Sequence, residues 1–199
     1  MNRLDCLKEL VTWIDKDVPV LTSLSSNTAI WASLRPDGMN FYGLNLGLTV
    51  GFSVGLSFAF PNSKVVGLDS DGSFMVDSSA LITMAEANPA NLMILVFDNE
   101  AYQLMGPTAT AKRTDLEKMA QGAGIKRTAT LRTVEEFITV VKPAFKETGP
   151  HFFVVKVQVE PVRLKSDARL TYSKFMKERF VDAVMKHPDY WGKKASSSS

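Results

Sequence analysis

Two short polar segments each follow an apolar run that is typical of a buried strand. DSDGS at 69–73 follows the first run, and Asp98-Asn99 follow the second, NLMILVF at 91–97. Their carboxylate and amide oxygens suit a hard cation, and magnesium prefers few protein ligands plus substrate phosphates. Gly72 would let the backbone approach a phosphate, and Ser73 would add donors. These residue types are compatible with a diphosphate–metal site, and a capped structural turn or another nucleotide site fits the same pattern.

The elements around these segments predict how they meet. Helical patterns alternate with strand patterns: we expect helices at 3–14, 29–34, 46–60, 77–87 and 167–187 and after Thr114 and Thr133, and strands at 18–24, 65–69, 91–97 and 152–159. Such alternation predicts an α/β fold, with a doubly wound, mainly parallel sheet sandwiched by helices. Because ligands bind outside the carboxyl ends of such strands, Asp71 and Asn99 should lie at one edge, within reach of one ion.

Four glycines recur at intervals of four in the apolar segment. Because of this spacing, we expect Gly43, Gly47, Gly51 and Gly55 to lie along one helical face. Each glycine destabilises a helix by about 1 kcal/mol relative to alanine. The pattern therefore indicates that another backbone packs closely there, either from a partner chain or from within the domain.

The composition limits the possible functions. The net charge of +2 gives no electrostatic case for nucleic acid or a membrane surface. Cys6 is the single cysteine, so neither a disulfide nor a cysteine-ligated cluster can form within the chain, and we expect a cytoplasmic protein. The 199 residues are expected to divide into a main domain at 1–160, a helical extension at 161–192 and a disordered tail at 193–199.

The segment from Asp69 to Tyr102 resembles the signature of thiamine diphosphate enzymes. In that family a Gly-Asp-Gly turn precedes an Asn-Asn or similar pair by about two dozen residues; here Ser70-Asp71-Gly72 matches the turn and Asn99 the pair. The resemblance implies thiamine diphosphate and Mg²⁺ as cofactors. It implies that the metal is bound by Asp71, Asn99 and the carbonyl of Ala101. It also implies that cofactor contacts come from Ser70, Gly72, Ser73 and Tyr102.

A second match lies upstream, at Leu44-Asn45-Leu46-Gly47. It resembles the family's Gly-Ser-hydrophobic-Gly segment, in which the apolar residue is a wedge that bends the cofactor into a V shape. The resemblance gives this catalytic role to Leu46, with Asn45 and Gly47 beside the cofactor. Without the downstream motif, the sequence would favour an ordinary core leucine at a helix start for Leu46.

Residues 1–160 are most similar to the diphosphate-binding (PP) domains of one branch of the thiamine diphosphate-dependent decarboxylases. This branch contains the β subunit of sulfopyruvate decarboxylase and the C-terminal half of phosphonopyruvate decarboxylase. The chain departs from the pattern at Ser70, Asp98, Leu44-Asn45 and Leu104-Met105-Gly106. The last segment replaces Ser-Thr-Gly, and the loss of two hydroxyls weakens the case for a sulfonate or phosphonate and points to a more apolar 2-oxo acid. Leu104 and Met105 could equally be packing residues.

The resemblance implies a diphosphate-binding subunit of a heteromeric 2-oxo acid decarboxylase or carboligase. The catalytic glutamate would come from a pyrimidine-domain partner chain, in an α₂β₂ or larger assembly acting on a small 2-oxo acid. Three alternatives stay open. A 2-oxoacid:ferredoxin oxidoreductase β chain is disfavoured by the single cysteine, a flavodoxin-like module does not explain Leu46 and Asn99 together, and a non-catalytic assembly subunit fits the departures.

Overall fold

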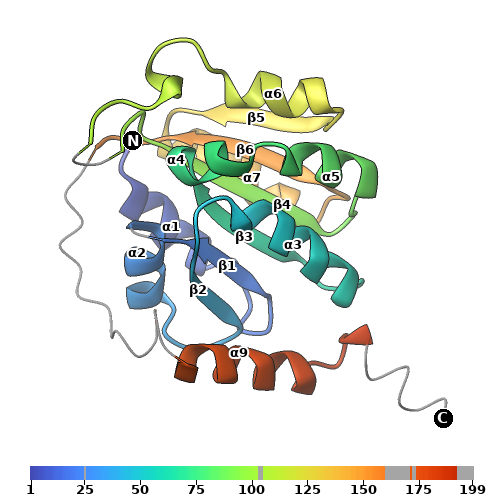
Figure 1. Cartoon of the computed structure of the whole chain (residues 1–199). Coiled ribbons are helices and arrows are strands. Elements are labelled where there is room, and N and C mark those ends of the chain that lie inside the picture. The colour runs from blue at the N-terminus through green and yellow to red at the C-terminus, as the bar shows by residue number, and fades with distance from the viewer. Residues whose placement is uncertain (25, 103–104, 160–170, 172–173, 192–199) are drawn as a thin grey trace.

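The fold is built on one six-stranded sheet in which every adjacent pair of strands is parallel (Figure 1). The computed structural model describes residues 1–24, 26–102, 105–159, 171 and 174–191. The order is β2-β1-β3-β4-β6-β5. The strands are β1 (Val20–Ser23), β2 (Asn40–Leu44), β3 (Val65–Ser70), β4 (Leu92–Asp98), β5 (Arg127–Leu131) and β6 (His151–Lys156). This arrangement confirms the predicted α/β fold.

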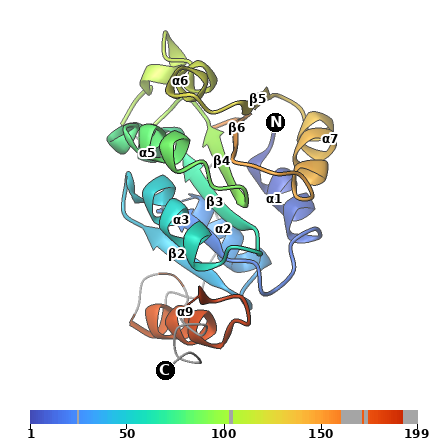
Figure 2. The ribbon, with the colours of Figure 1, turned by 90° about the vertical axis from the view of Figure 1, so that its right-hand side faces the viewer.

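Helices cover both faces of the sheet (Figure 2). One layer contains α1 (Arg3–Val11), α2 (Ser26–Leu34) and α7 (Val134–Ala144). The other contains α3 (Leu48–Ala59), α4 (Asp71–Phe74), α5 (Ala80–Ala87) and α6 (Leu116–Ala123). Two 3₁₀ turns, Met75–Asp77 and Ala109–Ala111, join these elements.

The central strand β4 explains why both faces need a helical layer. All seven of its residues are buried. Met93 and Phe97 enter the core under α1, α2 and α7, whereas Ile94 and Val96 enter the core under α3, α5 and α6. Because side chains alternate along a strand, a continuous apolar run is the pattern of a strand that is covered on both sides.

The sequence-based prediction missed the two edge strands, β2 and β5. β2 contains Gly43 and alternates between buried and half-buried residues, and in β5 only Leu131 is buried. An edge strand is paired and covered on fewer sides, so its sequence lacks the apolar run that identified the four inner strands.

Helix boundaries correct several predictions. α2 starts at Ser26 rather than at 29, and α3 starts at Leu48 rather than at 46. α6 is capped by Asp115, whose Oδ1 accepts from the Lys118 N–H at 3.1 Å, and not by Thr114. The capping box of Thr133 and Glu136 is confirmed.

The four glycines do not lie on one helical face, which corrects the prediction. Gly43 is in β2, and Gly47 precedes α3 with a left-handed φ of 84°. Gly51 and Gly55 are in α3. Among the described residues outside the helix backbone, a Cβ built on either would meet no atom within 4 Å. The described part of the chain therefore shows no close crossing at these two residues.

In the C-terminal segment, Lys174–Lys186 form helix α9. It lies against β2 at the edge of the sheet, where the rings of Phe180 and Phe41 meet edge to face with centroids 5.2 Å apart. The tail predicted at 193–199 lies outside the described residues. Within the part of the chain that the structure describes, no helix has the length and apolar character needed to cross a bilayer.

A buried histidine makes a pH dependence testable. Burial lowers the pKa of His151 to about 4, and the charges of Lys64 and Arg127 add to this effect. The unfolded chain binds this proton below about pH 6.5. The free energy of unfolding should therefore gain a component that falls as the pH falls from about 6.5 to about 4.

Chemical denaturation of the wild type and His151→Phe across this range isolates that component, because other titrating groups are common to both proteins. The wild type should lose stability relative to the variant as the pH falls. A difference between them that stays constant with pH would contradict the prediction.

Candidate functional site

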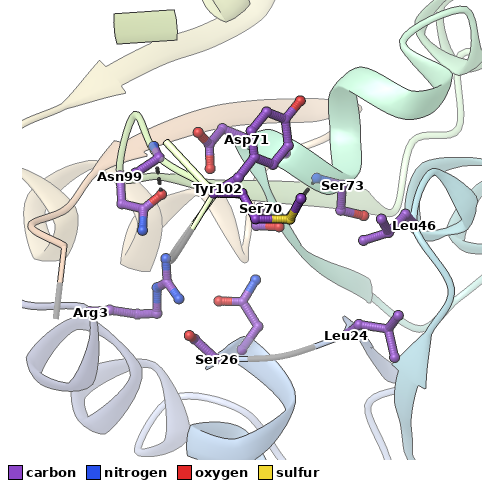
Figure 3. Close-up of a pocket in the computed structure, with 13 residues that line it drawn as sticks. Arg3, Leu24, Ser26, Leu46, Ser70, Asp71, Ser73, Asn99 and Tyr102 are labelled. Carbon is purple, nitrogen blue, oxygen red and sulfur yellow. Dashed lines mark hydrogen bonds between the residues drawn. The ribbon is translucent and has the colours of Figure 1, made fainter. Parts of the chain in front are cut away.

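A cavity of about 360 Å³ lies at the carboxyl ends of β1, β3 and β4 (Figure 3). Most of the predicted cofactor residues line it: Leu46, Ser70, Asp71, Gly72, Ser73, Asn99, Ala101 and Tyr102. Asn45 is exposed and Gly47 is buried, and neither lines the cavity. The parallel sheet thus brings together residues from two distant sequence motifs.

The turn after β3 accommodates serine in place of the family's glycine. Ser70 has an extended backbone, with φ −120°, so a Cβ is unstrained there. Its Oγ accepts from the Ser73 N–H at 3.4 Å and caps α4. Gly72, in contrast, cannot be replaced without movement, because a Cβ would lie 2.6 Å from Cε1 of Tyr102.

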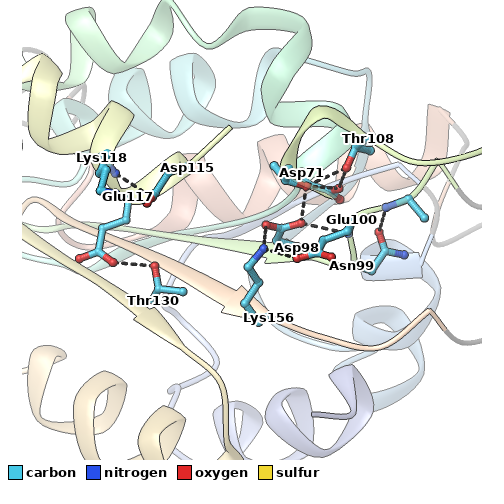
Figure 4. Close-up of polar contacts among 12 residues, drawn as sticks. Asp71, Asp98, Asn99, Glu100, Thr108, Asp115, Glu117, Lys118, Thr130 and Lys156 are labelled. Atoms are coloured by element: carbon cyan, nitrogen blue, oxygen red, sulfur yellow. Dashed lines mark hydrogen bonds and ion pairs between the residues drawn. The ribbon is translucent and has the colours of Figure 1, made fainter. Parts of the chain in front are cut away.

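Asp71 is buried, with 1% of its surface exposed, and is held by a chain of polar contacts (Figure 4). Its Oδ2 accepts from the Thr108 hydroxyl at 2.8 Å. The Thr108 and Thr110 hydroxyls are 2.7 Å apart, and Thr110 donates to Asp98 Oδ1 at 2.8 Å. Lys156 Nζ lies 2.7 Å from Asp98 Oδ2. The chain links two buried carboxyl groups through two hydroxyls.

The burial of Asp71 has an electrostatic consequence. Thr110 also lies 3.4 Å from Asp71 Oδ2, so both hydroxyls contact this carboxyl group. Burial raises the pKa of Asp71 to about 6, the charge of Asp98 acts in the same direction, and the Thr108 hydrogen bond and the charge of Arg3 oppose it.

Asn99 and Ala101 follow β4 in a tight loop that faces Asp71. Asn99 Oδ1 accepts from the Ala101 N–H at 3.2 Å, and Glu100 between them has φ 61°. Ala101 also forms an antiparallel bridge with Pro107. The bridge returns the chain to Thr108, the residue that donates to Asp71. One loop therefore carries both the predicted metal ligands after β4 and the hydrogen-bond partner of Asp71.

The segment before α3 forms the opposite wall of the cavity. The left-handed backbone of Gly47 directs its N–H to the Ser73 hydroxyl, at 3.3 Å. A Cβ at Gly47 would lie 3.1–3.3 Å from Val76 and Asp77. Leu46 precedes this turn and lines the cavity with 49% of its surface exposed. Leu46 is thus at the cavity wall and not in the core, which disfavours an ordinary core leucine.

Sequence reasoning missed several polar residues around the cavity. Arg3 of α1 and Asn27 of α2 both line it, and Thr108 and Thr110 support Asp71. Asn27 could have been suspected, because SSN follows a predicted strand whose end lies at the same edge of the sheet. No local pattern distinguishes Arg3, which lies in an ordinary amphipathic helix.

The donor set fits magnesium with a phosphate ligand. Asp71, Asn99 and Ala101 offer a carboxylate, an amide oxygen and a carbonyl, and Mg²⁺ is commonly bound by one or two carboxylates plus substrate phosphates. The described residues contain no group of three His, Cys, Asp or Glu side chains that could hold a metal without such help. Asn27 Oδ1 is buried and has no hydrogen-bond partner among the described residues, which is typical of a ligand site.

Several curated relatives of this chain are named as decarboxylases. The β subunit of sulfopyruvate decarboxylase from Methanocaldococcus jannaschii is 28% identical over 177 residues, covering 82% of this chain and 93% of that protein. The corresponding subunit from Methanococcus maripaludis is 26% identical and covers 94% of this chain and 99% of that protein. Sulfopyruvate decarboxylase from Methanosarcina acetivorans is 33% identical over 69% of this chain, which spans 36% of that longer protein.

Solved structures agree on the fold. The 4-hydroxybenzoylformate decarboxylase of Rhodococcus jostii, a thiamine diphosphate-dependent enzyme, superposes with a TM-score of 0.67 at 21% identity, over 80% of this chain and 33% of that one. Benzoylformate decarboxylase from Polynucleobacter necessarius superposes with a TM-score of 0.61 at 21% identity. The match covers 82% of this chain and 33% of that one. This chain therefore spans about a third of these enzymes.

A family model decides the assignment. The C-terminal TPP-binding domain of thiamine pyrophosphate enzymes matches residues 29–155, more than half of the chain. The matched range contains both sequence motifs and every predicted ligand of the metal. Thiamine pyrophosphate is another name for thiamine diphosphate. The chain therefore belongs to the thiamine pyrophosphate enzymes and contains their C-terminal, cofactor-binding domain.

Proposed function

We propose that this protein is the diphosphate-binding subunit of a thiamine diphosphate-dependent 2-oxo acid decarboxylase. The observation that carries the proposal is the convergence of Asp71, Asn99 and Ala101 on one cavity whose far wall holds Leu46 (Figure 3). Relatives of nearly the same length, named as decarboxylase β subunits, support it. We place the assembled enzyme in the cytoplasm.

In this proposal Asp71, the Asn99 side chain and the Ala101 carbonyl hold magnesium, and Gly72 and Ser73 contact the diphosphate. Bound thiamine diphosphate supplies the carbon nucleophile and the electron sink for loss of carbon dioxide from a 2-oxo acid. This chain's task is to orient that group. Thr108 fixes the Asp71 carboxylate through its hydrogen bond, and Leu46 supports the bent shape from the opposite wall.

We propose that a partner chain completes the site. Several apolar side chains are exposed around the cavity mouth and on the neighbouring face of α3: Leu46, Leu48, Phe52, Val76, Tyr102 and Met105. Gly51 and Gly55 lie in the same helix with open space above them. Large exposed apolar patches mark interaction sites. The partner would be a pyrimidine-domain subunit that contributes the catalytic glutamate, in an α₂β₂ or larger assembly.

The substrate is proposed only as a small 2-oxo acid. Met105 stands beside the cavity with 90% of its surface exposed, where the family has a hydroxyl-bearing segment. An apolar side chain at this place favours a substrate with an apolar group over a sulfonate. Whether the enzyme releases an aldehyde or joins the product to an acceptor depends on the completed pocket.

Isothermal titration of the full chain with thiamine diphosphate and Mg²⁺, alone and with the co-expressed partner, tests the proposal. We expect Mg²⁺-dependent binding in the assembled protein. Absence of binding in both preparations would contradict the proposal and would favour a non-catalytic assembly subunit.

Asp71→Asn should separate stability from binding. The raised pKa of Asp71 means that its ionised form is disfavoured by the fold. A neutral amide should therefore stabilise the metal-free protein at pH 7 by about 1–3 kcal/mol. The same change removes the charged metal ligand, so Mg²⁺-dependent cofactor binding should be lost. Thermal unfolding and titration calorimetry measure the two effects.

Asp69→Asn is the matched control for this experiment. Asp69 is also buried, and burial raises its pKa to about 6, but it does not line the cavity. The Asp69→Asn variant should be more stable than the wild type, and its affinity for the cofactor should stay within a few-fold of the wild-type value. Equal loss of binding in both variants would contradict the assignment of the metal to Asp71.

Gly51→Leu and Gly55→Leu should disrupt assembly while leaving the fold intact. Neither new side chain meets an atom of this chain near its Cβ, and leucine is favoured over glycine in a helix. Thermal stability of the isolated chain should therefore not fall, whereas co-purification with the partner should be lost. Gly122→Leu in α6 is the matched control, since its Cβ also points into open space. Unchanged assembly in all three variants would place the interface elsewhere.

A further inference from the structure

Arg3 is a buried cation in the wall of the cavity, and neither sequence motif contains it. It is the first residue of α1, with 8% of its surface exposed. It lines the same cavity as Asp71 and Asn99, and its side chain rises from α1 toward them (Figure 3). Among the described residues that line the cavity, Arg3 and Asp71 carry charged side chains.

The place of Arg3 in its helix is electrostatically unfavourable. The N-terminal end of a helix carries a partial positive charge, so a cation in the first turn is destabilising. Burial adds a desolvation cost. Helix formation alone therefore does not explain why an arginine occupies this position, whereas a place in the wall of a cavity that binds an anion would.

Arg3 is positioned both at its guanidinium and through the backbone around it. Its Cζ lies 5.7 Å from the centroid of the Phe97 ring, and Phe97 is on β4, two residues before Asn99. The chain before Arg3 is fixed to the segment that follows β6, since the Gln158 N–H donates to the Met1 carbonyl at 2.9 Å. The Asn2 side chain caps α1 by accepting from the Leu4 N–H at 2.7 Å. A cation fixed in this way loses little entropy when it binds a ligand.

The charges in the proposed cofactor site leave room for one more cation. A magnesium ion does not neutralise a diphosphate together with the Asp71 carboxylate. Arginine presents a planar fork of N–H donors that matches phosphate oxygens and is always charged. We propose that Arg3 binds the diphosphate of the cofactor directly, as a second cationic contact beside the metal. This inference rests on the proposed function.

The test compares Arg3→Met and Arg3→Lys with the wild type in the full chain, assembled with its partner. Titration calorimetry measures the affinity for thiamine diphosphate and for inorganic pyrophosphate, each with Mg²⁺. Charge-assisted hydrogen bonds contribute about 1.5–3 kcal/mol. We therefore expect Arg3→Met to weaken both ligands by about 10- to 150-fold, and Arg3→Lys to weaken them less. Salt should weaken pyrophosphate binding more steeply in the wild type than in Arg3→Met, a result that a purely structural role does not produce.

Arg35→Met is the matched control. Arg35 is also buried, and its Cζ lies 5.8 Å from the centroid of the Trp31 ring. It donates to Asn40 and to the Val18 carbonyl, at the opposite end of β1 from the cavity. The Arg35→Met variant should be less stable than the wild type but should bind pyrophosphate with the same affinity. Thermal unfolding of each variant verifies that it is folded. If Arg3→Met does not fold, the affinity comparison is made with Arg3→Lys.

The outcomes separate this inference from the proposed function. Wild-type protein that binds neither ligand would overturn the proposed function. Wild-type protein that binds both, with folded Arg3 variants of equal affinity and equal salt dependence, would overturn only the role of Arg3. Loss of thiamine diphosphate binding with unchanged pyrophosphate binding would also overturn it, because the contact would then be to another part of the cofactor.

Discussion

The parallel alignment of β1, β3 and β4 is the constraint on which the site depends. Ser70 of β3 pairs in register with Phe97 of β4, so Asp71 and Asn99 each lie within two residues of one paired position. β1 pairs with the other side of β3 and delivers the chain to α2 and Asn27 at the same edge. No flexible loop is needed to bring these residues together, because the hydrogen-bonded sheet positions them.

The site is built from features that destabilise the protein when no ligand is bound. Asp71 is a buried carboxyl with a raised pKa, Glu100 has a left-handed backbone, and Arg3 is a buried cation at a helix N-terminus. Each of these is unfavourable on its own. Their gathering at one edge of an otherwise apolar, well-packed sheet is the expected signature of a binding site for a charged ligand. The hydrogen bonds through Thr108 and Thr110 hold the Asp71 carboxyl group in place despite the cost of burying it.

How much the sequence could predict depended on whether the signal was local. The inner strands and the meeting of Asp71 with Asn99 follow from apolar runs and from the geometry of parallel sheets, and both were found. The edge strands β2 and β5 are half covered, so they lack that run. Arg3 reaches the cavity only through the docking of α1, and no pattern near residue 3 encodes it. Asp98 looked like a departure from the metal motif, yet its side chain pairs with Lys156 and Thr110 rather than lining the cavity.

The central claim is that magnesium and the diphosphate bind at the carboxyl edge of β3 and β4. A crystal structure of the assembled protein with thiamine diphosphate and Mn²⁺ in place of Mg²⁺ tests it directly, since Mn²⁺ is located by anomalous scattering. The account predicts one Mn²⁺ at about 2.1–2.3 Å from Asp71, Asn99 Oδ1 and the Ala101 carbonyl oxygen, bridged to the diphosphate. A metal bound elsewhere, or a diphosphate held without contact to Asp71, would contradict it.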